Sequence, residues 1–126
     1  MEQKKYQVQP PVLHSAVYVP EPTPAVETPQ VQSQGLDAWI AQAGIAGGDV
    51  EYVKYIVFKE SSNNPLATNG QAYGLCQALP GSKMASAGSD WATNPVTQLQ
   101  WCNGYAIQRY GSWANAYNTW LTKHWW

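Results

Sequence analysis

Charged side chains are scarce in this sequence. Asp, Glu, Lys and Arg make up only 12% of its 126 residues, and seven basic against eight acidic side chains give a formal net charge of −1. The chain therefore lacks the basic surplus that a nucleic-acid partner would require, and it has no acidic run typical of a solvating tail. Its length leaves room for one domain with a modest core.

Long apolar runs are missing as well. No stretch approaches the roughly 20 apolar residues of a membrane-spanning helix, so the sequence predicts no membrane span. Lys4 and Lys5 are not followed by an apolar run either, and no signal peptide is visible. Two explanations stay open: a leader was removed and Met1 was added afterwards, or export uses another route.

Histidine and cysteine are few. His14 and His124 lie far apart, and Cys76 and Cys102 form neither a C-x-x-C nor a Cys/His pattern. We therefore expect no metal site, no cysteine nucleophile and no cofactor. An even cysteine count in a small extracytoplasmic domain favours a disulfide, which would stabilise the fold by roughly 3 kcal/mol. Two buried thiols are the alternative.

Aromatic residues, by contrast, are abundant. They make up 13% of the chain and include seven tryptophans. Aromatic rings, amides and hydroxyls suit carbohydrate recognition, because a sugar ring has an apolar face to stack on and hydroxyls to hydrogen-bond. For any single aromatic residue, including the possible stacking platforms Trp91 and Trp113, core packing is the favoured interpretation.

The composition changes near residue 35. Six of the nine prolines fall within residues 10–29. Proline fixes φ and removes a hydrogen-bond donor, so this segment cannot build a helix or a ladder. We interpret residues 1–35 as a semi-rigid extended linker. The alternative is that this segment is a remnant without a function. One folded domain is expected over residues 36–126.

Helical periodicity begins this domain. Residues 36–43 predict a first helix, and Asp49 is the predicted N-cap of a second. On one face of the second helix an apolar stripe runs to a carboxylate, at spacings of three and four: Val53, Ile56, Val57 and Glu60.

A loop-rich region precedes two more predicted helices. Residues 65–90 are rich in Gly, Asn and Ser, with a short hairpin expected around residues 71–79. Pro95 begins a helix whose apolar positions include Ile107, and Gly111 ends it. A last helix over residues 112–124 carries Trp113, Tyr117 and Trp120 on one face. The sequence thus predicts a mainly α, compact domain.

The most specific pattern follows the second helix. It consists of Glu60-Ser61, Asn64-Pro65, Ala67, Gly74-Leu75-Cys76-Gln77, Pro80-Gly81-Ser82, Asn94-Pro95, Gly104-Tyr105 and Ala116-Tyr117-Asn118. These motifs, in this order over about residues 36–126, resemble the lytic transglycosylase and goose-type lysozyme family. The likeness is greatest to its small secreted members from Gram-positive bacteria. It implies a lysozyme-like fold, mainly α with a small β part.

The resemblance also implies an activity. Members cut the MurNAc–GlcNAc β-1,4 bond of peptidoglycan glycan strands, and Glu60 matches their catalytic acid. An acid of this kind must hold its proton when substrate binds, which burial beside apolar side chains favours. The positions expected to contact the glycan are Ser61, Tyr73, Gly74, Leu75, Gln77, Tyr117 and Asn118. The alternatives are that the Ser61 hydroxyl bonds its own helix and that Gly74 forms an ordinary turn.

A second catalytic carboxylate is harder to find. Asp90, in a loop before Trp91, is the one candidate. The family instead implies that a single Glu acts as acid and then as base, while the 6-hydroxyl of muramic acid attacks and leaves a 1,6-anhydro product. The sequence departs from the family at Asn63, where an aromatic is usual, and at Thr119-Trp120, where Ala-Gly is usual.

Three alternatives remain open. The domain could be a hydrolytic muramidase, a non-catalytic surface protein that binds the cell wall, or a phage lysin. For the domain itself we expect a secreted or wall-associated monomer whose partner is the peptidoglycan glycan strand.

Overall fold

The computed structural model describes residues 35–126, and this part of the chain is mainly helical, as the sequence predicts. The linker predicted for residues 1–35 lies outside the described residues, except for Gly35. In chain order the elements are α3 (Leu36–Gln42), α4 (Asp49–Ser61), β1 (Thr68–Asn69), β2 (Ala72–Tyr73), the 3-10 helix η2 (Gly81–Ser86), α5 (Pro95–Tyr110) and α6 (Trp113–Lys123).

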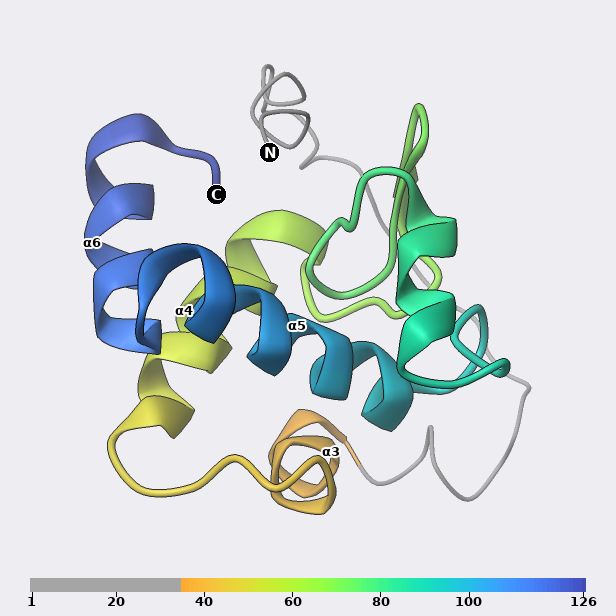
Figure 1. The fold of residues 1–126 in the computed structure, drawn as a ribbon, viewed down its shortest axis with the longest axis horizontal. Helices are drawn as coiled ribbons and strands as arrows, with labels where there is room; N and C mark the ends of the chain where they lie inside the picture. Colours follow the sequence, from red (N-terminus) through yellow and green to blue (C-terminus); the bar gives the residue numbers. More distant parts are fainter. Residues whose placement is uncertain (1–34) are drawn as a thin grey trace.

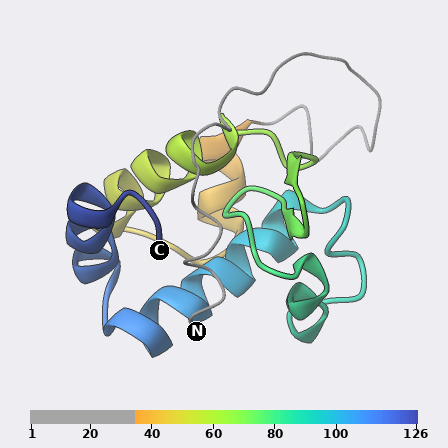
Figure 2. The same ribbon diagram turned by 90° about the horizontal axis from the view of Figure 1, so that it is seen from above.

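The helices surround α5, which crosses the domain (Figure 1). α6 packs against both α4 and α5 at one end, while the hairpin of β1 and β2 lies with η2 at the opposite end (Figures 1 and 2). The two strands are antiparallel, with Thr68 opposite Tyr73 and Asn69 opposite Ala72. None of the helices between residues 35 and 126 is both long and apolar enough to cross a membrane.

The ends of α5 follow the sequence signals. The side chain of Asn94 accepts a hydrogen bond from the Val96 N–H, and Pro95 stands at the first helical position, where no N–H is needed. Gly111 ends the helix with a φ of 91°, in the left-handed region that favours glycine. These local signals therefore fix both ends of the longest helix.

The start of α4 differs from the prediction, because the N-cap is Gly48 and not Asp49. Gly48 already has helical backbone angles, and no side chain caps the helix. Asp49 is instead the first helical residue. There its carboxylate, like that of Glu51, lies near the positive end of the helix dipole.

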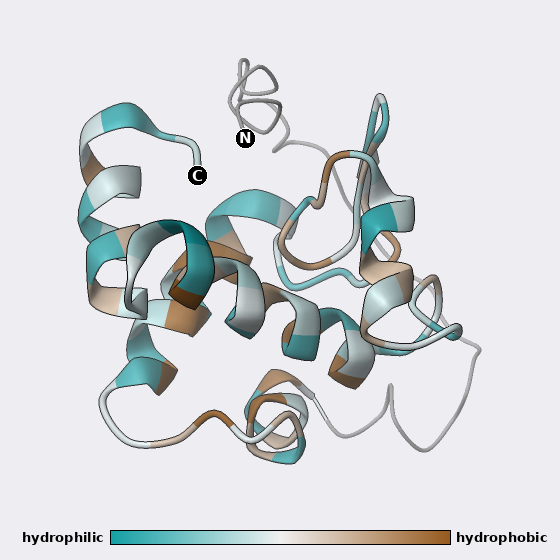
Figure 3. Ribbon diagram, in the orientation of Figure 1, coloured by the Kyte–Doolittle hydropathy of each residue, from teal (hydrophilic) through white to brown (hydrophobic). Residues whose placement is uncertain are grey.

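The core is built from all four α-helices and the loop after β2. Its fully or nearly fully buried hydrophobic residues are Trp39, Ile40, Ile45, Val53, Ile56, Val57, Leu75, Cys76, Leu99, Cys102, Ala106, Trp113, Ala116 and Trp126. Hydrophobic positions recur along α4 and α5, whereas the tip of the hairpin is hydrophilic (Figure 3). Within α5, Ile107 is one of the apolar positions seen in the sequence, but its side chain is 47% exposed. It lies about 100° around the helix from Ala106, which is buried in its place.

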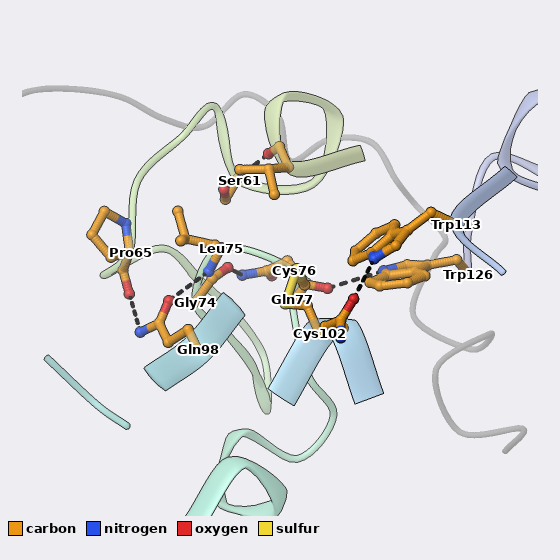
Figure 4. The surroundings of a disulfide bond; sticks show 12 residues. Ser61, Pro65, Gly74, Leu75, Cys76, Gln77, Gln98, Cys102, Trp113 and Trp126 are labelled. Carbon is orange, nitrogen blue, oxygen red and sulfur yellow. Dashed lines mark hydrogen bonds between the residues drawn. A yellow bond between two sulfur atoms is a disulfide. The ribbon is translucent and has the colours of Figure 1, made fainter. Parts of the chain in front are cut away.

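Cys76 and Cys102 form the predicted disulfide, with their Cα atoms 6.4 Å apart. The bond joins the loop after β2 to the middle of α5 (Figure 4). Beside it, the indole of Trp126 stacks on Trp113 at a centroid distance of 5.4 Å. Trp113 is thus a core residue, and its N–H donates to the side-chain oxygen of Asn103.

Candidate active site

Glu60 lies in the last turn of α4, at the end of a stripe of fully buried apolar side chains. Glu60 itself is half-buried. Its Oε2 accepts a hydrogen bond of 2.8 Å from the indole N–H of Trp120 in α6. Two helices that are distant in sequence therefore meet at this carboxyl group.

Aromatic rings surround the contact between α4 and α6. The Tyr55 ring lies edge-on to Trp120 at 5.7 Å and to Tyr117 at 5.0 Å, and Tyr117 also contacts Tyr52 at 4.9 Å. The Lys59 ammonium lies 5.8 Å from the centroid of Trp120, within the range of a cation–π contact. The Trp120 ring, which contacts Glu60, is thus packed against both Tyr55 and Lys59.

Two tyrosines of α5 interact electrostatically with Glu60. Burial raises the pKa of Tyr105 and of Tyr110, and the charge of Glu60 adds a smaller effect in the same direction. The Arg109 guanidinium, which lies over both tyrosine rings, opposes this rise. Glu60 thus acts electrostatically on α5, while its hydrogen bond from Trp120 joins α4 to α6.

Ser61 and the turn after it are organised by backbone contacts. The Ser61 hydroxyl donates to the carbonyl oxygen of Val57, four residues earlier, at 3.0 Å. This is the backbone interpretation that the sequence left open, and a contact of Ser61 with glycan stays a prediction. Ser62 and Asn63 then take positive φ values of 55° and 66°, which turns the chain away from the helix.

Tyr73 and Gly74 are held by contacts within the fold. The Tyr73 hydroxyl donates to the carbonyl oxygen of Ala92 at 2.7 Å, and burial raises its pKa. Gly74 has a φ of 86°, and a Cβ built on it would lie 2.8 Å from Oε1 of Gln98. The structure therefore requires glycine at this position whether or not a sugar approaches it.

Gln98 is a site-supporting residue that the sequence interpretation missed. It is fully buried in α5, where its Oε1 accepts from the Leu75 N–H at 2.9 Å. Its Nε2 donates to the carbonyl oxygen of Pro65 at 2.9 Å (Figure 4). The same Nε2 donates to the carbonyl oxygen of Trp91, also at 2.9 Å. One amide thus fastens three loop segments to α5. The available signal was a polar residue directly before Leu99 on the apolar face of a predicted helix.

Gln77 also supports the loop. It is buried and has a positive φ of 55°, and its Nε2 donates to the carbonyl oxygens of Ala67 and Gly74. A non-glycine residue in the left-handed region is strained, and the surrounding hydrogen bonds hold it there. Its predicted contact with glycan remains a prediction.

Tyr117 and Asn118 occupy the middle of α6. Tyr117 is half-buried against Tyr52 and Tyr55, and Asn118 is exposed. One turn later, Trp120 makes the contact with Glu60. Trp120 stands where the family pattern has a glycine, so the resemblance gave no reason to expect this contact.

Asp90 is exposed and is engaged at the start of α5. Its two carboxylate oxygens accept from the side chains of Asn94 at 2.8 Å and Thr97 at 2.7 Å, and these bonds lower its pKa. The side chain thus organises the entry into α5. Among the described residues, no group of three or more His, Cys, Asp or Glu side chains could hold a metal ion.

The chain matches no protein-family model, no curated protein and no solved structure. The family resemblance therefore depends on the motifs of this sequence alone.

Proposed function

We propose that residues 36–126 act as a lytic transglycosylase on bacterial peptidoglycan and cut the MurNAc–GlcNAc β-1,4 bond. The observation that carries the proposal is the placement of Glu60, half-buried at the end of the apolar stripe of α4, with its Oε2 bonded to the Trp120 indole and the rings of Tyr55 and His124 packed against that indole. Partial burial favours a neutral carboxyl group, which the general acid of a glycosidase must supply. The exposed parts of such rings suit the apolar faces of sugars.

The reaction needs only one carboxyl group. Protonated Glu60 donates its proton to the glycosidic oxygen while the bond from that oxygen to the MurNAc anomeric carbon breaks. The 6-hydroxyl oxygen of the same MurNAc then bonds to the anomeric carbon, and its proton passes to the Glu60 carboxylate. The products are a free GlcNAc hydroxyl and a 1,6-anhydroMurNAc end, and the acid returns to its starting state.

Within residues 35–126, the surroundings of the other carboxylates support this single-residue route. The two-carboxylate route needs a partner within about 10 Å of the acid. Asp49 and Glu51 stand in the first turn of α4, more than about 13 Å along the helix axis from Glu60. Asp37 forms an ion pair with Lys54, and Asp90 bonds the first turn of α5. A hydrolytic muramidase is therefore the less favoured enzyme.

A non-catalytic protein that binds the cell wall is the second candidate. It is favoured by one observation: the side chains of Ser61 and Gln77, both expected at the glycan, are bonded to the protein's own backbone. In that case the aromatic residues around Glu60 would bind glycan without cutting it.

We also propose that the protein works outside the cytoplasm, at the cell wall. The disulfide between Cys76 and Cys102 supports this location, because such bonds persist in oxidising compartments. The substrate itself is found there.

Mass analysis of the products separates these possibilities. Purified peptidoglycan is incubated with the wild type and with Glu51→Gln, which makes the same change on an exposed part of the same helix. Soluble muropeptides with 1,6-anhydroMurNAc ends from both proteins are the expected result. Products heavier by one water would indicate a muramidase. Binding to peptidoglycan without any soluble product would overturn the enzymatic proposal and support the second candidate.

A further inference from the structure

The hydrogen bond between Trp120 and Glu60 joins residues 60 positions apart, and it has a fixed direction. An indole N–H can only donate, so Oε2 of Glu60 is the acceptor at 2.8 Å in either charge state of the carboxyl group. In a neutral carboxyl group the carbonyl oxygen is the better acceptor. The proton of neutral Glu60 is therefore directed to its other oxygen, Oε1.

We propose that Trp120 is a positioning residue for Glu60, which selects Oε1 as the proton-carrying oxygen and stabilises the carboxylate after the proton has left. The hydrogen bond alone supports the effect on ionisation, whereas the effect on catalysis rests on the proposed function. A hydrogen bond to an ionised oxygen is roughly twice as strong as one between neutral groups. The contact therefore strengthens as Oε1 gives up its proton, and it helps the transition state more than the ground state.

Packing fixes Trp120 for this task. Its ring lies edge-on to Tyr55 at 5.7 Å and contacts the His124 ring at 5.2 Å, while the Lys59 ammonium lies 5.8 Å from its centroid. These neighbours come from both α4 and the end of α6. Because the ring is held on several sides, its N–H need not be reoriented at each turnover.

Charged groups around the pair also affect its titration. Lys59 and His124 contact the Trp120 ring, and the charge of Glu60 is coupled to Tyr105 and Tyr110 with Arg109 beside them. A change in Trp120 must therefore be compared with a matched change in a tryptophan outside the contact between Trp120 and Glu60. Trp101 is suitable, since it is half-buried in α5 and stacks on Tyr105 at 4.9 Å.

The first test needs no substitution of Trp120. In ¹H–¹⁵N spectra recorded against pH, the indole signal of Trp120 is expected to move with the titration of the Glu60 carboxyl group. This movement should disappear in Glu60→Gln, while the Trp101 indole signal shows no such step in either protein. A Trp120 signal that is insensitive to the ionisation of Glu60 would overturn the proposal.

The second test removes the donor. In Trp120→Phe, the ¹³C titration of the Glu60 carboxyl group should shift to higher pH, because the charged form loses a hydrogen bond. Trp101→Phe should leave it unchanged. With peptidoglycan as substrate, the alkaline limb of the pH–rate profile should shift the same way, and kcat should fall about tenfold or more with a smaller change in KM.

The outcomes keep the two proposals distinguishable. If no protein releases products but the Trp120→Phe titration shifts, the cleavage proposal fails and the positioning effect stands. If the wild type cuts glycan but Trp120→Phe retains both its titration and its pH profile, Trp120 has only a structural role. Should Trp120→Phe fail to fold, the ¹H–¹⁵N titration of the wild type decides the question.

Discussion

The indole N–H of Trp126 donates to the carbonyl oxygen of Cys76 at 3.1 Å, and the two residues are 50 positions apart. The Trp126 ring is fully buried against Trp113. The main-chain oxygen of Trp126 accepts a hydrogen bond from the Tyr105 hydroxyl at 2.7 Å. Trp126, three residues beyond the end of α6, thus connects the disulfide loop, α5 and α6. Of these three parts, α6 also supplies the hydrogen bond from Trp120 to the candidate acid.

Trp126→Ala should therefore destabilise the domain strongly. Removing a buried aromatic side chain of this size costs about 3–5 kcal/mol through lost transfer free energy and the cavity left behind. The free energy of unfolding in urea measures the loss. Leu121→Ala, at a residue that is 46% exposed, should change it by less than about 1 kcal/mol. Equal losses in the two variants would show that Trp126 is not part of the core.

The disulfide should contribute about 3 kcal/mol, because it closes a loop of 26 residues in the unfolded chain. A reducing agent should lower the unfolding midpoint of the wild type accordingly. The double variant Cys76→Ala/Cys102→Ala should start at the lower midpoint and should not respond to the reducing agent. An unchanged wild-type midpoint under full reduction would contradict the contribution.

Two glycine substitutions should have opposite signs. Gly74→Ala places a Cβ 2.8 Å from Oε1 of Gln98 at a positive φ, so it should destabilise by about 2 kcal/mol or more. Gly104→Ala, inside α5 with no atom near the new Cβ, should stabilise by about 0.5–1 kcal/mol through helix propensity. Thermal unfolding of both variants checks the pair. A neutral Gly74→Ala would mean that the loop moves freely away from Gln98.

Asp90 should make stability depend on pH in acid. Its pKa in the folded protein is lowered by hydrogen bonds from Asn94 and Thr97. The stabilising effect of ionised Asp90 is therefore complete above the ordinary Asp pKa of 3.8. It is lost as the pH falls through the lower pKa that Asp90 has in the folded protein. Asp90→Asn should be less stable than the wild type at neutral pH, by less than about 1 kcal/mol because the group is exposed.

The difference between wild type and Asp90→Asn should disappear in strong acid. Thr97→Val, which removes one donor, should show a weaker version of the same pH dependence. Urea unfolding at several pH values measures both. A difference that stays constant down to the lowest pH would show that the Asp90 charge does not carry the effect.

Local signals in the sequence predicted much of the fold. The apolar spacing of Val53, Ile56 and Val57 located α4, and Pro95 with Gly111 marked the ends of α5. The disulfide followed from an even cysteine count. Two local details were wrong or missed. The chain already turns into helix at Gly48, so Asp49 is not the cap, and η2 formed within the Gly- and Ser-rich region for which the sequence predicted loops and a short hairpin but no helix.

The side-chain partners of the candidate site could not be predicted, because they are set by packing between distant segments. Nothing local shows that Gln98 bonds three loops or that Trp120 reaches Glu60 across 60 positions. Glu60 itself was found because it continues a helical stripe and belongs to a recognisable motif. Its partner became visible only when α4 and α6 were placed side by side.

The central claim is that Glu60 carries out glycan cleavage, and the most direct test is the rate of muropeptide release by Glu60→Gln. The wild type and Glu51→Gln should release products at similar rates. Glu60→Gln, with its fold verified by an unchanged unfolding transition, should lose activity by about 10²-fold or more, as expected for removal of a general acid. Cleavage at the wild-type rate by folded Glu60→Gln would contradict the account.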